Sequence, residues 1–283
     1  MFTLNLENEK NVIVDINDGV NYVVTSVTGL NPPSASIYTS QSPNRKGVKY
    51  NGSNLNERNV GITVKLLGDV ETNRNALYEW CDPEQYVKIR YSNGIKNVYC
   101  EGHVEECEID YFTNNELVNL SIICEDPYWK DLLSIITDIS NIVKHFSFDF
   151  SISKPIPFSS MKDDNTTRIF NAGAESGVII TIIALEDIEN ITLYDGEDPS
   201  KMIQINTTLR KNEKVIIDTE SSPKHIKRYK VDGSSENILK YTNRNLTWFT
   251  LKKGNNSFRY TIEDGKENNA VVTFKFTTKY LGV

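Results

Sequence analysis

Strict alternation of apolar and polar residues dominates the first half of the chain. A period of two is typical of strands with one buried face. The pattern occurs at residues 2–8, 11–16, 59–68, 103–112 and 116–125. Residues 86–102 (YVKIRYSNGIKNVYCEG) predict a hairpin, because Asn93-Gly94 supplies the positive φ angles of a tight turn. We therefore expect a small antiparallel sheet in this half.

One helix is predicted, over residues 71–81 (ETNRNALYEWC). Asp69 is a suitable N-cap residue, and Pro83 ends the pattern. Leu77, Trp80 and Cys81 share one face of this helix.

Residues 31–59 form a long polar stretch with three prolines and many Asn and Ser residues. Compact domains rarely contain so long a connection unless it has a function. Two interpretations remain open: disorder, or an arm that becomes ordered against a neighbouring subunit. The candidate interface residues of this arm are Arg45, Lys46, Lys49, Tyr50 and Arg58.

The second half contains short apolar strands at fairly even spacing, separated by turn residues such as Asp195-Gly196, Asp232-Gly233 and Asp264-Gly265. This pattern predicts an all-β sandwich or jelly roll of roughly 130–150 residues. The expected strands include residues 145–152, 177–185, 190–196, 201–205, 214–219, 247–254, 257–265 and 270–280, and residues 253–256 are an expected turn. The predicted fold is mainly β, with an N-terminal antiparallel sheet or split barrel with one helix (1–130) and a C-terminal sandwich (131–283).

The boundary between these domains is predicted at ICEDPYWKDL, residues 123–132. Pro127 disfavours helical geometry at Asp126, so the last strand of the first domain should end there. Tyr128 and Trp129 are expected to pack at the junction and to fix the angle between the domains.

Composition agrees with a globular protein: of 283 residues, 39% are hydrophobic and 24% are charged. No apolar run is long enough for a membrane-spanning helix, and the first residues do not resemble a secretory signal, so folding in a cytosol is expected. Residues 1–130 hold 11 Lys and Arg against 18 Asp and Glu, whereas residues 201–283 hold 16 against 8. This asymmetry favours docking against charged neighbours and argues against nucleic-acid binding by a uniformly basic face.

Catalytic and metal-binding patterns are sparse. The four cysteines lack Cys-x-x-Cys spacing and are expected to be small core residues. Cys100-x-x-His103-x-x-x-Cys107 is a weak candidate metal site, since alternation places His103 and Cys107 on one strand face and Cys100 on the other or in the preceding turn. No cofactor or metal is expected.

Two other arrangements suggest chemistry only weakly. Glu106, Glu108 and Asp110 share a strand face, but glycoside cleavage requires two carboxyls across a cleft, so a solvated surface is the favoured interpretation. A β-sandwich can also stack aromatic side chains on a sugar. The aromatic candidates are Tyr229, Tyr241, Trp248 and Tyr260.

The ordered set of motifs resembles the distal tail proteins (Dit) of long-tailed phages. In the first half, the resemblance rests on ERNVGITVKLLGD (57–69), RNALYEW (74–80), the 86–102 hairpin and CEDPYWKD (124–131). In the second half it rests on IFNAGAESGVIITI (169–182), KVIIDT (214–219) and TWFTLKKGNNSFRY (247–260), which includes Trp248, Leu251, Gly254 and Asn256.

The resemblance implies a virion protein of the tail tip or baseplate, assembled in the cytoplasm of the host bacterium and without enzymatic activity. It implies a homo-hexameric ring formed by the N-terminal domain, with a galectin-like sandwich outside it. The implied partners are the tail-tube protein, the tail-associated hub or lysin, and in some members a receptor-binding protein. Two alternatives remain: a module that binds cell-wall glycans, and a wall hydrolase.

Overall fold

The structure is a computed structural model that describes residues 2–43, 46–111, 116–138 and 166–283. The strand expected at residues 145–152 lies outside these ranges. The chain forms two compact units: unit 1 consists of residues 1–132 and 279–283, and unit 2 of residues 133–278. The chain leaves unit 1 within β10 (Trp129–Asp138) and returns to it within β19 (Ala270–Tyr280).

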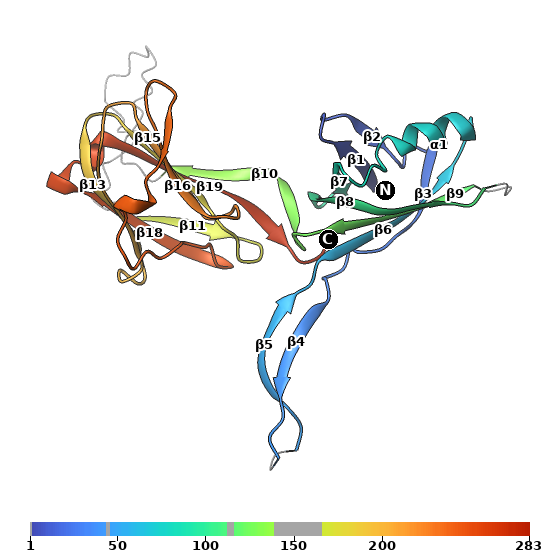
Figure 1. The fold of residues 1–283 in the computed structure, drawn as a ribbon, viewed down its shortest axis with the longest axis horizontal. Helices are drawn as coiled ribbons and strands as arrows, with labels where there is room; N and C mark the ends of the chain where they lie inside the picture. Colours follow the sequence, from blue (N-terminus) through green and yellow to red (C-terminus); the bar gives the residue numbers. More distant parts are fainter. Residues whose placement is uncertain (1, 44–45, 112–115, 139–165) are drawn as a thin grey trace, which may run out of the picture. The chain divides into compact units, whose positions relative to one another are not determined.

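Unit 1 is an antiparallel β structure with one α-helix among its described residues (Figure 1). Its elements are β1 (Thr3–Asn8), β2 (Ile13–Asp15), β3 (Tyr22–Val27), β4 (Ala35–Ser40), β5 (Lys49–Leu55), β6 (Arg58–Leu66), α1 (Val70–Tyr78), β7 (Tyr86–Ser92), β8 (Asn97–Ile109), β9 (Leu117–Cys124) and the start of β10.

The long strand β8 connects the two parts of this structure. Its first part pairs with β7, which continues to β1 and β2, and with the start of β10. Its second part pairs with β9, which continues to β6 and β3. Alternate residues of these strands form one apolar core that includes Leu4, Val64, Ile89, Ile122 and Trp129. The alternation in the sequence therefore predicts the buried faces of unit 1.

Two local predictions in unit 1 need correction. The helix has the predicted N-cap, since Asp69 accepts a hydrogen bond from the Thr72 amide (3.4 Å), but it ends at Tyr78, three residues earlier than expected. In the turn between β7 and β8 only Gly94 has a positive φ angle (+83°). Asn93 contributes differently, because its side-chain oxygen accepts the amide hydrogens of the two residues after Gly94.

Unit 2 is a sandwich of two antiparallel sheets. One sheet has the order β17-β16-β15-β12-β19, and the other has the order β11-β18-β13-β14. Residues from the facing sides of both sheets, such as Ile182, Phe274, Leu193 and Tyr260, form one core. The strands are β11 (Thr166–Asn171), β12 (Ile179–Ala184), β13 (Ile188–Asp195), β14 (Met202–Leu209), β15 (Lys214–Asp218), β16 (His225–Tyr229), β17 (Ser235–Asn237), β18 (Gly254–Ile262) and β19. The predicted mainly β fold is confirmed.

The segment expected as a strand at residues 247–254 is not a regular strand. Phe249 and Leu251 are buried as alternation predicts, but before β18 the strand pairing is reduced to an isolated bridge between Leu251 and Ser176. The turn expected at residues 253–256 is also wrong, because β18 begins at Gly254. Apolar alternation shows that a segment is extended and half-buried, but not that a neighbouring strand pairs with it. No helix in the described part of the chain is long and apolar enough to cross a membrane.

Candidate functional site

The polar stretch at residues 31–59 contains an ordered hairpin. Strands β4 and β5 pair with each other in a two-stranded sheet of their own, and in Figure 1 this hairpin extends away from the remaining strands of unit 1. Every described residue of the two strands is exposed except Gly52, which is half-exposed. An isolated two-stranded hairpin is only marginally stable in water. A hairpin of this kind is suited to packing against another chain.

The two faces of the hairpin differ in polarity. The register pairs Ile37 with Ser53, Ala35 with Leu55 and Thr39 with Tyr50. Directly opposed residues share a face, so Ile37, Tyr50 and Leu55 lie on the same face, which we call the apolar hairpin face. Their exposed fractions are 65%, 61% and 39%. A bulge after Tyr38 keeps Tyr50 on this face, where its hydroxyl lies 2.8 Å from the Ser53 hydroxyl.

The opposite face of the hairpin is mostly polar. It carries Ser36, Tyr38 and Asn54, and Ser36 donates a hydrogen bond to the side chain of Asn56 (2.8 Å). Tyr38 is the large aromatic residue on this side and is 53% exposed. The hairpin therefore combines one apolar face with one mostly hydrophilic face.

Arg58 was predicted as an interface residue of the arm, but within this chain it is buried and lies outside the hairpin. It begins β6 rather than belonging to the hairpin, and only 2% of its surface is exposed. A charge buried to this extent requires partners, and its guanidinium donates hydrogen bonds to four main-chain carbonyls. The acceptors are Pro127 (2.8 Å), Asn31 (2.8 Å), Leu281 (2.7 Å) and Gly29.

The surroundings of Arg58 explain why it stays buried. Its guanidinium lies 5.6 Å from the centre of the Trp129 ring. Burial lowers the pKa of Arg58 from its usual value, although the charged form persists at neutral pH. Gly29 and Asn31 precede β4, so Arg58 fixes the base of the hairpin to the core of unit 1. We call Arg58 and its four carbonyl partners the arginine anchor.

The remaining predicted arm residues are placed as follows. Lys46, Lys49 and Tyr50 are exposed on or beside β5, whereas Arg45 lies outside the described residues. Their role at a subunit interface stays a prediction.

The predicted junction residues make their contacts within unit 1. Asp126 forms ion pairs with Lys130 (3.1 Å) and Lys279 (3.3 Å). Burial alone raises the pKa of a carboxyl, but these two ammonium groups outweigh it and hold the pKa of Asp126 below its usual value. Trp129 is fully buried beside Tyr91, and Tyr128 lies under the Lys279 ammonium. Their expected role in fixing the angle between the domains stays a prediction.

A bulge in β8 changes the predicted arrangement of the cysteines. The pairing of β8 with β9 shifts between Val104 and Glu106. His103 therefore points away from the core, whereas Cys107 is turned toward it and packs against it, as Cys100 does. The expectation that His103 and Cys107 share a face is wrong for this reason. Among the residues that the structure describes, no three His, Cys, Asp or Glu side chains are grouped to bind a metal ion.

The carboxylates on the outer side of β8 are exposed. The neighbouring charge of Glu108 raises the pKa of Glu106, as expected for two like charges on one strand face. Neither side chain lines the pocket beside the base of the hairpin, although the neighbouring Glu105 does. This geometry favours a solvated surface over a catalytic pair.

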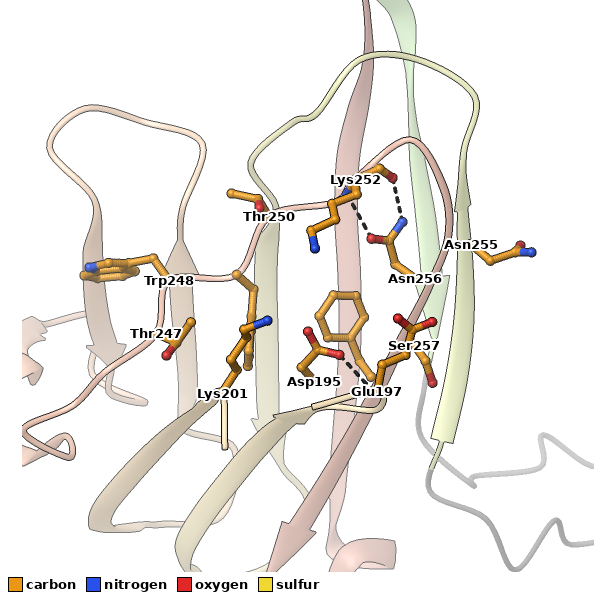
Figure 2. A pocket seen from close by; sticks show the side chains of 12 residues that line it. Asp195, Glu197, Lys201, Thr247, Trp248, Thr250, Lys252, Asn255, Asn256 and Ser257 are labelled. Carbon is orange, nitrogen blue, oxygen red and sulfur yellow. Dashed lines mark hydrogen bonds between the residues drawn. The ribbon is translucent and has the colours of Figure 1, made fainter. Parts of the chain in front are cut away.

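Unit 2 has a pocket of about 210 Å³ at one end of the sandwich (Figure 2). In Figure 2 the side chains of Asp195, Lys201 and Lys252 face the same space, and Trp248 lies at its edge. Two buried rings, Phe249 and Phe258, form part of the lining.

Trp248 is a candidate sugar-binding residue from the sequence pattern, whereas no sequence pattern predicted the charged residues of this pocket. The Asp195-Gly196 turn was the available signal, because Asp195 accepts the amide hydrogen of Glu197 (2.9 Å) and so places both carboxylates at the pocket. Of the other candidate aromatics, Tyr260 is fully buried in the core, Tyr241 packs against it, and Tyr229 lies under the Lys214 ammonium.

Two family models match the chain. The model of the phage tail protein RIFT-related domain matches residues 3–124, and the model of the siphovirus-type tail component, C-terminal domain, matches residues 171–280. Together they cover most of both units. No curated protein sequence matches the chain.

Solved structures share the fold at low sequence identity. The crystal structure of the Dit protein of phage SPP1, described as a paradigm of the hub adsorption apparatus in phages that infect Gram-positive bacteria, matches with a TM-score of 0.69. Identity is 14%, over 98% of this chain and 99% of that one. Chains of the activated phage P2 baseplate match with TM-scores of 0.55 (calcium form, 12% identity) and 0.52 (strontium form, 11%), over the full length of both chains.

Proposed function

This chain belongs to the distal tail protein family of long-tailed phages, whose members are structural components of the tail tip, and we propose that six copies assemble into a ring through the β4–β5 hairpin. The ring connects the tail tube to the tail-associated hub or lysin and supports receptor-binding components. Its role is structural rather than enzymatic. The protein assembles in the host cytoplasm and remains in the virion.

The apolar hairpin face is the observation that carries this proposal. Ile37, Tyr50 and Leu55 are exposed side by side on a hairpin that has no core of its own. Fully burying a large apolar side chain contributes about 1.5–3 kcal/mol. Scaled by the exposed fractions, covering these three contributes roughly 2.5–5 kcal/mol per subunit contact. In a closed ring that contact is repeated at every interface.

A ring requires two different complementary surfaces on each subunit, because its contacts run head to tail. The hairpin supplies one surface, and its base is held by the arginine anchor. The acidic balance of residues 1–130 and the basic balance of residues 201–283 are compatible with contacts between unlike surfaces.

Ile37→Asp tests the ring, because it places a charge at the centre of the apolar hairpin face. Asn54→Asp is the matched control, since it adds the same charge to the same hairpin on the opposite face. We expect the wild type and Asn54→Asp to form hexamers in native mass spectrometry and light scattering, and Ile37→Asp to dissociate into smaller species. The far-UV circular dichroism spectra of all three should coincide, because Ile37 lies outside the core of unit 1 and its replacement leaves the subunit folded.

A monomeric wild type at every concentration would contradict the proposal, as would an Ile37→Asp hexamer of unchanged stability. The partners are tested by isolating virion tails and identifying the proteins cross-linked to this chain. We expect the tail-tube protein and the hub or lysin among them.

A second candidate function rests on the pocket of unit 2. Its carboxylates and ammonium groups, with Trp248 at the edge, suit a small hydroxyl-rich ligand such as one unit of a cell-wall glycan. Calorimetry with fragments of host wall polysaccharide tests this function, comparing the wild type with Asp195→Asn and Lys252→Met. Binding that is absent from the wild type, or unchanged in both variants, would exclude this pocket as a glycan site.

A further inference from the structure

Two asparagines of this chain are followed directly by glycine. Asn51-Gly52 lies in β5, and Asn93-Gly94 lies in the turn between β7 and β8. Asparagine before glycine is the dipeptide that loses its side-chain ammonia most readily, because glycine has no side chain to hinder attack by its own amide nitrogen. The attack requires rotation of the backbone between the two residues. Local structure therefore decides which of the two pairs reacts.

Asn51 lies at an irregularity of the hairpin. The register pairs Tyr38 with Gly52, and the next residue of β4, Thr39, pairs with Tyr50. Asn51 is therefore the extra residue of a β-bulge and has no residue opposite it in the ladder. Its side chain is exposed, and no atom lies within 4 Å of the place that a Cβ atom of Gly52 would occupy. The bulge leaves room for the backbone to rotate here.

The side chain of Asn51 is held only weakly. Its oxygen accepts a hydrogen bond from the Ser40 hydroxyl (3.3 Å), and both residues are exposed. A donor at this oxygen draws electrons from the side-chain carbon and so makes that carbon easier to attack. The ladder around Asn51 has two strands, and an isolated two-stranded hairpin is only marginally stable in water. Rotation at Asn51 therefore disturbs no core.

The side chain of Asn93 is held firmly. Its oxygen accepts the amide hydrogens of Ile95 (3.1 Å) and Lys96 (2.9 Å), and its own amide donates to the Lys96 carbonyl (3.2 Å). The strands joined by this turn carry core residues such as Ile89 and Val98. Rotation at Asn93 breaks these hydrogen bonds, and each bond that has to open slows a reaction by a factor of roughly 2–12.

We propose that Asn51 is a site of spontaneous deamidation in the unassembled chain, and that its isoaspartate product prevents the hairpin from closing the ring. The Gly52 amide loses its proton to water, and its nitrogen attacks the side-chain carbon of Asn51. The side-chain nitrogen takes up a proton and leaves as ammonia, which gives a cyclic imide. Water then opens the imide at either carbonyl and forms aspartate or isoaspartate, without an oxidant or a reductant.

The two products act differently on the hairpin. Aspartate adds a charge near Ser40 and Lys49, which pair with each other on the mostly polar face. Isoaspartate inserts an extra carbon atom into the main chain between Tyr50 and Leu55, so it displaces these apolar residues relative to each other. Resting on the proposed function, this displacement removes the contact with the next subunit. A hairpin already packed in the ring is protected from the reaction.

The chemistry is tested on full-length wild type and on Ile37→Asp, which is expected to stay unassembled. Both are incubated at physiological pH and temperature, folded and in urea, and digested at intervals. Trypsin separates residues 50–58 from residues 91–96, so one digest follows both sites by mass. In urea we expect similar rates. In folded Ile37→Asp, the rate at Asn51 should stay within about fivefold of its value in urea, and the rate at Asn93 should fall by about tenfold or more.

The effect on assembly is tested with Asn51→Gln as the matched control, because glutamine forms the cyclic imide much more slowly. Wild type and Asn51→Gln are aged in urea, refolded and compared by native mass spectrometry. Both carry the same change at Asn93, so a difference reports residue 51. We expect hexamers from Asn51→Gln, and a loss of hexamer in the wild type that follows its isoaspartate content, measured with an isoaspartyl methyltransferase. Fresh Asn51→Asp should form hexamers, and samples refolded without ageing report refolding itself.

Equal recovery of hexamers from aged wild type and aged Asn51→Gln would overturn the proposal. Faster reaction at Asn93 than at Asn51 in folded Ile37→Asp would also overturn it, as would equal slowing of the two sites. A wild type that is monomeric before ageing would refute the proposed ring instead. The rates at Asn51 and Asn93 would still decide the chemistry in that case.

Discussion

Replacing Arg58 by methionine is expected to destabilise unit 1 strongly. Methionine keeps much of the apolar length of the side chain but removes all donors to the four carbonyls of the arginine anchor. The carbonyls of Gly29 and Asn31 precede the hairpin, that of Pro127 follows β9, and that of Leu281 follows β19. The substitution therefore releases three separate segments at once.

The magnitude follows from these contacts. A hydrogen bond to a charged group contributes about 1.5–3 kcal/mol, so four of them give a gross stabilisation of roughly 6–12 kcal/mol. Desolvation of the guanidinium opposes this by several kcal/mol. Removing one partner of a buried charged network usually costs about 3–5 kcal/mol, and we expect a loss in that range. Arg58→Lys should decrease the free energy of unfolding by about half as much as Arg58→Met. A lysine ammonium cannot reach four carbonyls in the planar arrangement of a guanidinium.

The three tryptophans allow unit 1 to be followed alone. Trp80 and Trp129 belong to unit 1, so in a Trp248→Phe background fluorescence reports only its unfolding. Urea titrations of this background, with and without Arg58→Met, give the difference in unfolding free energy. Arg244→Met is the matched control, since Arg244 is exposed in unit 2, and it should change stability by less than about 0.5 kcal/mol.

A decrease in unfolding free energy of less than about 1 kcal/mol for Arg58→Met would refute this reasoning, because the substitution leaves four carbonyls without their charged hydrogen-bond donor. Equal stability of Arg58→Lys and the wild type would show that charge, rather than the geometry of the guanidinium, holds the anchor. Hydrogen exchange adds an independent check, because the amide of Val283, which donates to Leu30 (3.1 Å), should lose protection in Arg58→Met.

Two further predictions concern the residues that follow β9. Lys130 and Lys279 hold the pKa of Asp126 below its usual value. The ion pairs of Asp126 therefore contribute fully to the free energy of unfolding above about pH 4, the ordinary carboxyl pKa. This contribution is lost as the pH falls through the lowered pKa of Asp126 in the folded protein. Asp126→Asn should therefore reduce stability by about 1 kcal/mol at pH 7, and urea titrations should show this difference disappearing toward pH 3; a difference independent of pH would contradict the ion-pair explanation. Trp129→Ala removes a fully buried ring and should cost about 3–5 kcal/mol, with weaker ring assembly in native mass spectrometry. Unchanged stability and assembly would rule out that role.

Alternation in the sequence predicted most strands because their inner residues share one core. β6, with buried Val60, Ile62 and Val64, is typical of these strands. The N-cap Asp69 was predictable for a similar reason, since capping depends on a few neighbouring residues.

Rules that depend on neighbouring residues, such as alternation and capping, do not predict the hairpin or the bulge. Strands β4 and β5 are nearly all polar or exposed, so nothing in their pattern distinguishes a projecting hairpin from a disordered loop. The bulge in β8 arises from its pairing with β9, and it reversed the predicted facing of Cys107. Arg58 was predicted as an arm residue because it lies in the polar stretch 31–59. Its burial was not predictable, since two of its carbonyl partners, Pro127 and Leu281, come from distant parts of the chain.

The discontinuity of unit 1 has a consequence for protein synthesis. Leu281 and Gly282 accept hydrogen bonds from Arg58 and Lys96, so residues 279–283 complete the native contacts of unit 1. On the ribosome these residues emerge only after all of unit 2. A growing chain therefore holds the hairpin base without its last anchoring carbonyl until translation has passed residue 281. Chains that stop before residue 281 would carry an unfinished hairpin base, which links synthesis of residues 279–283 to competence for assembly.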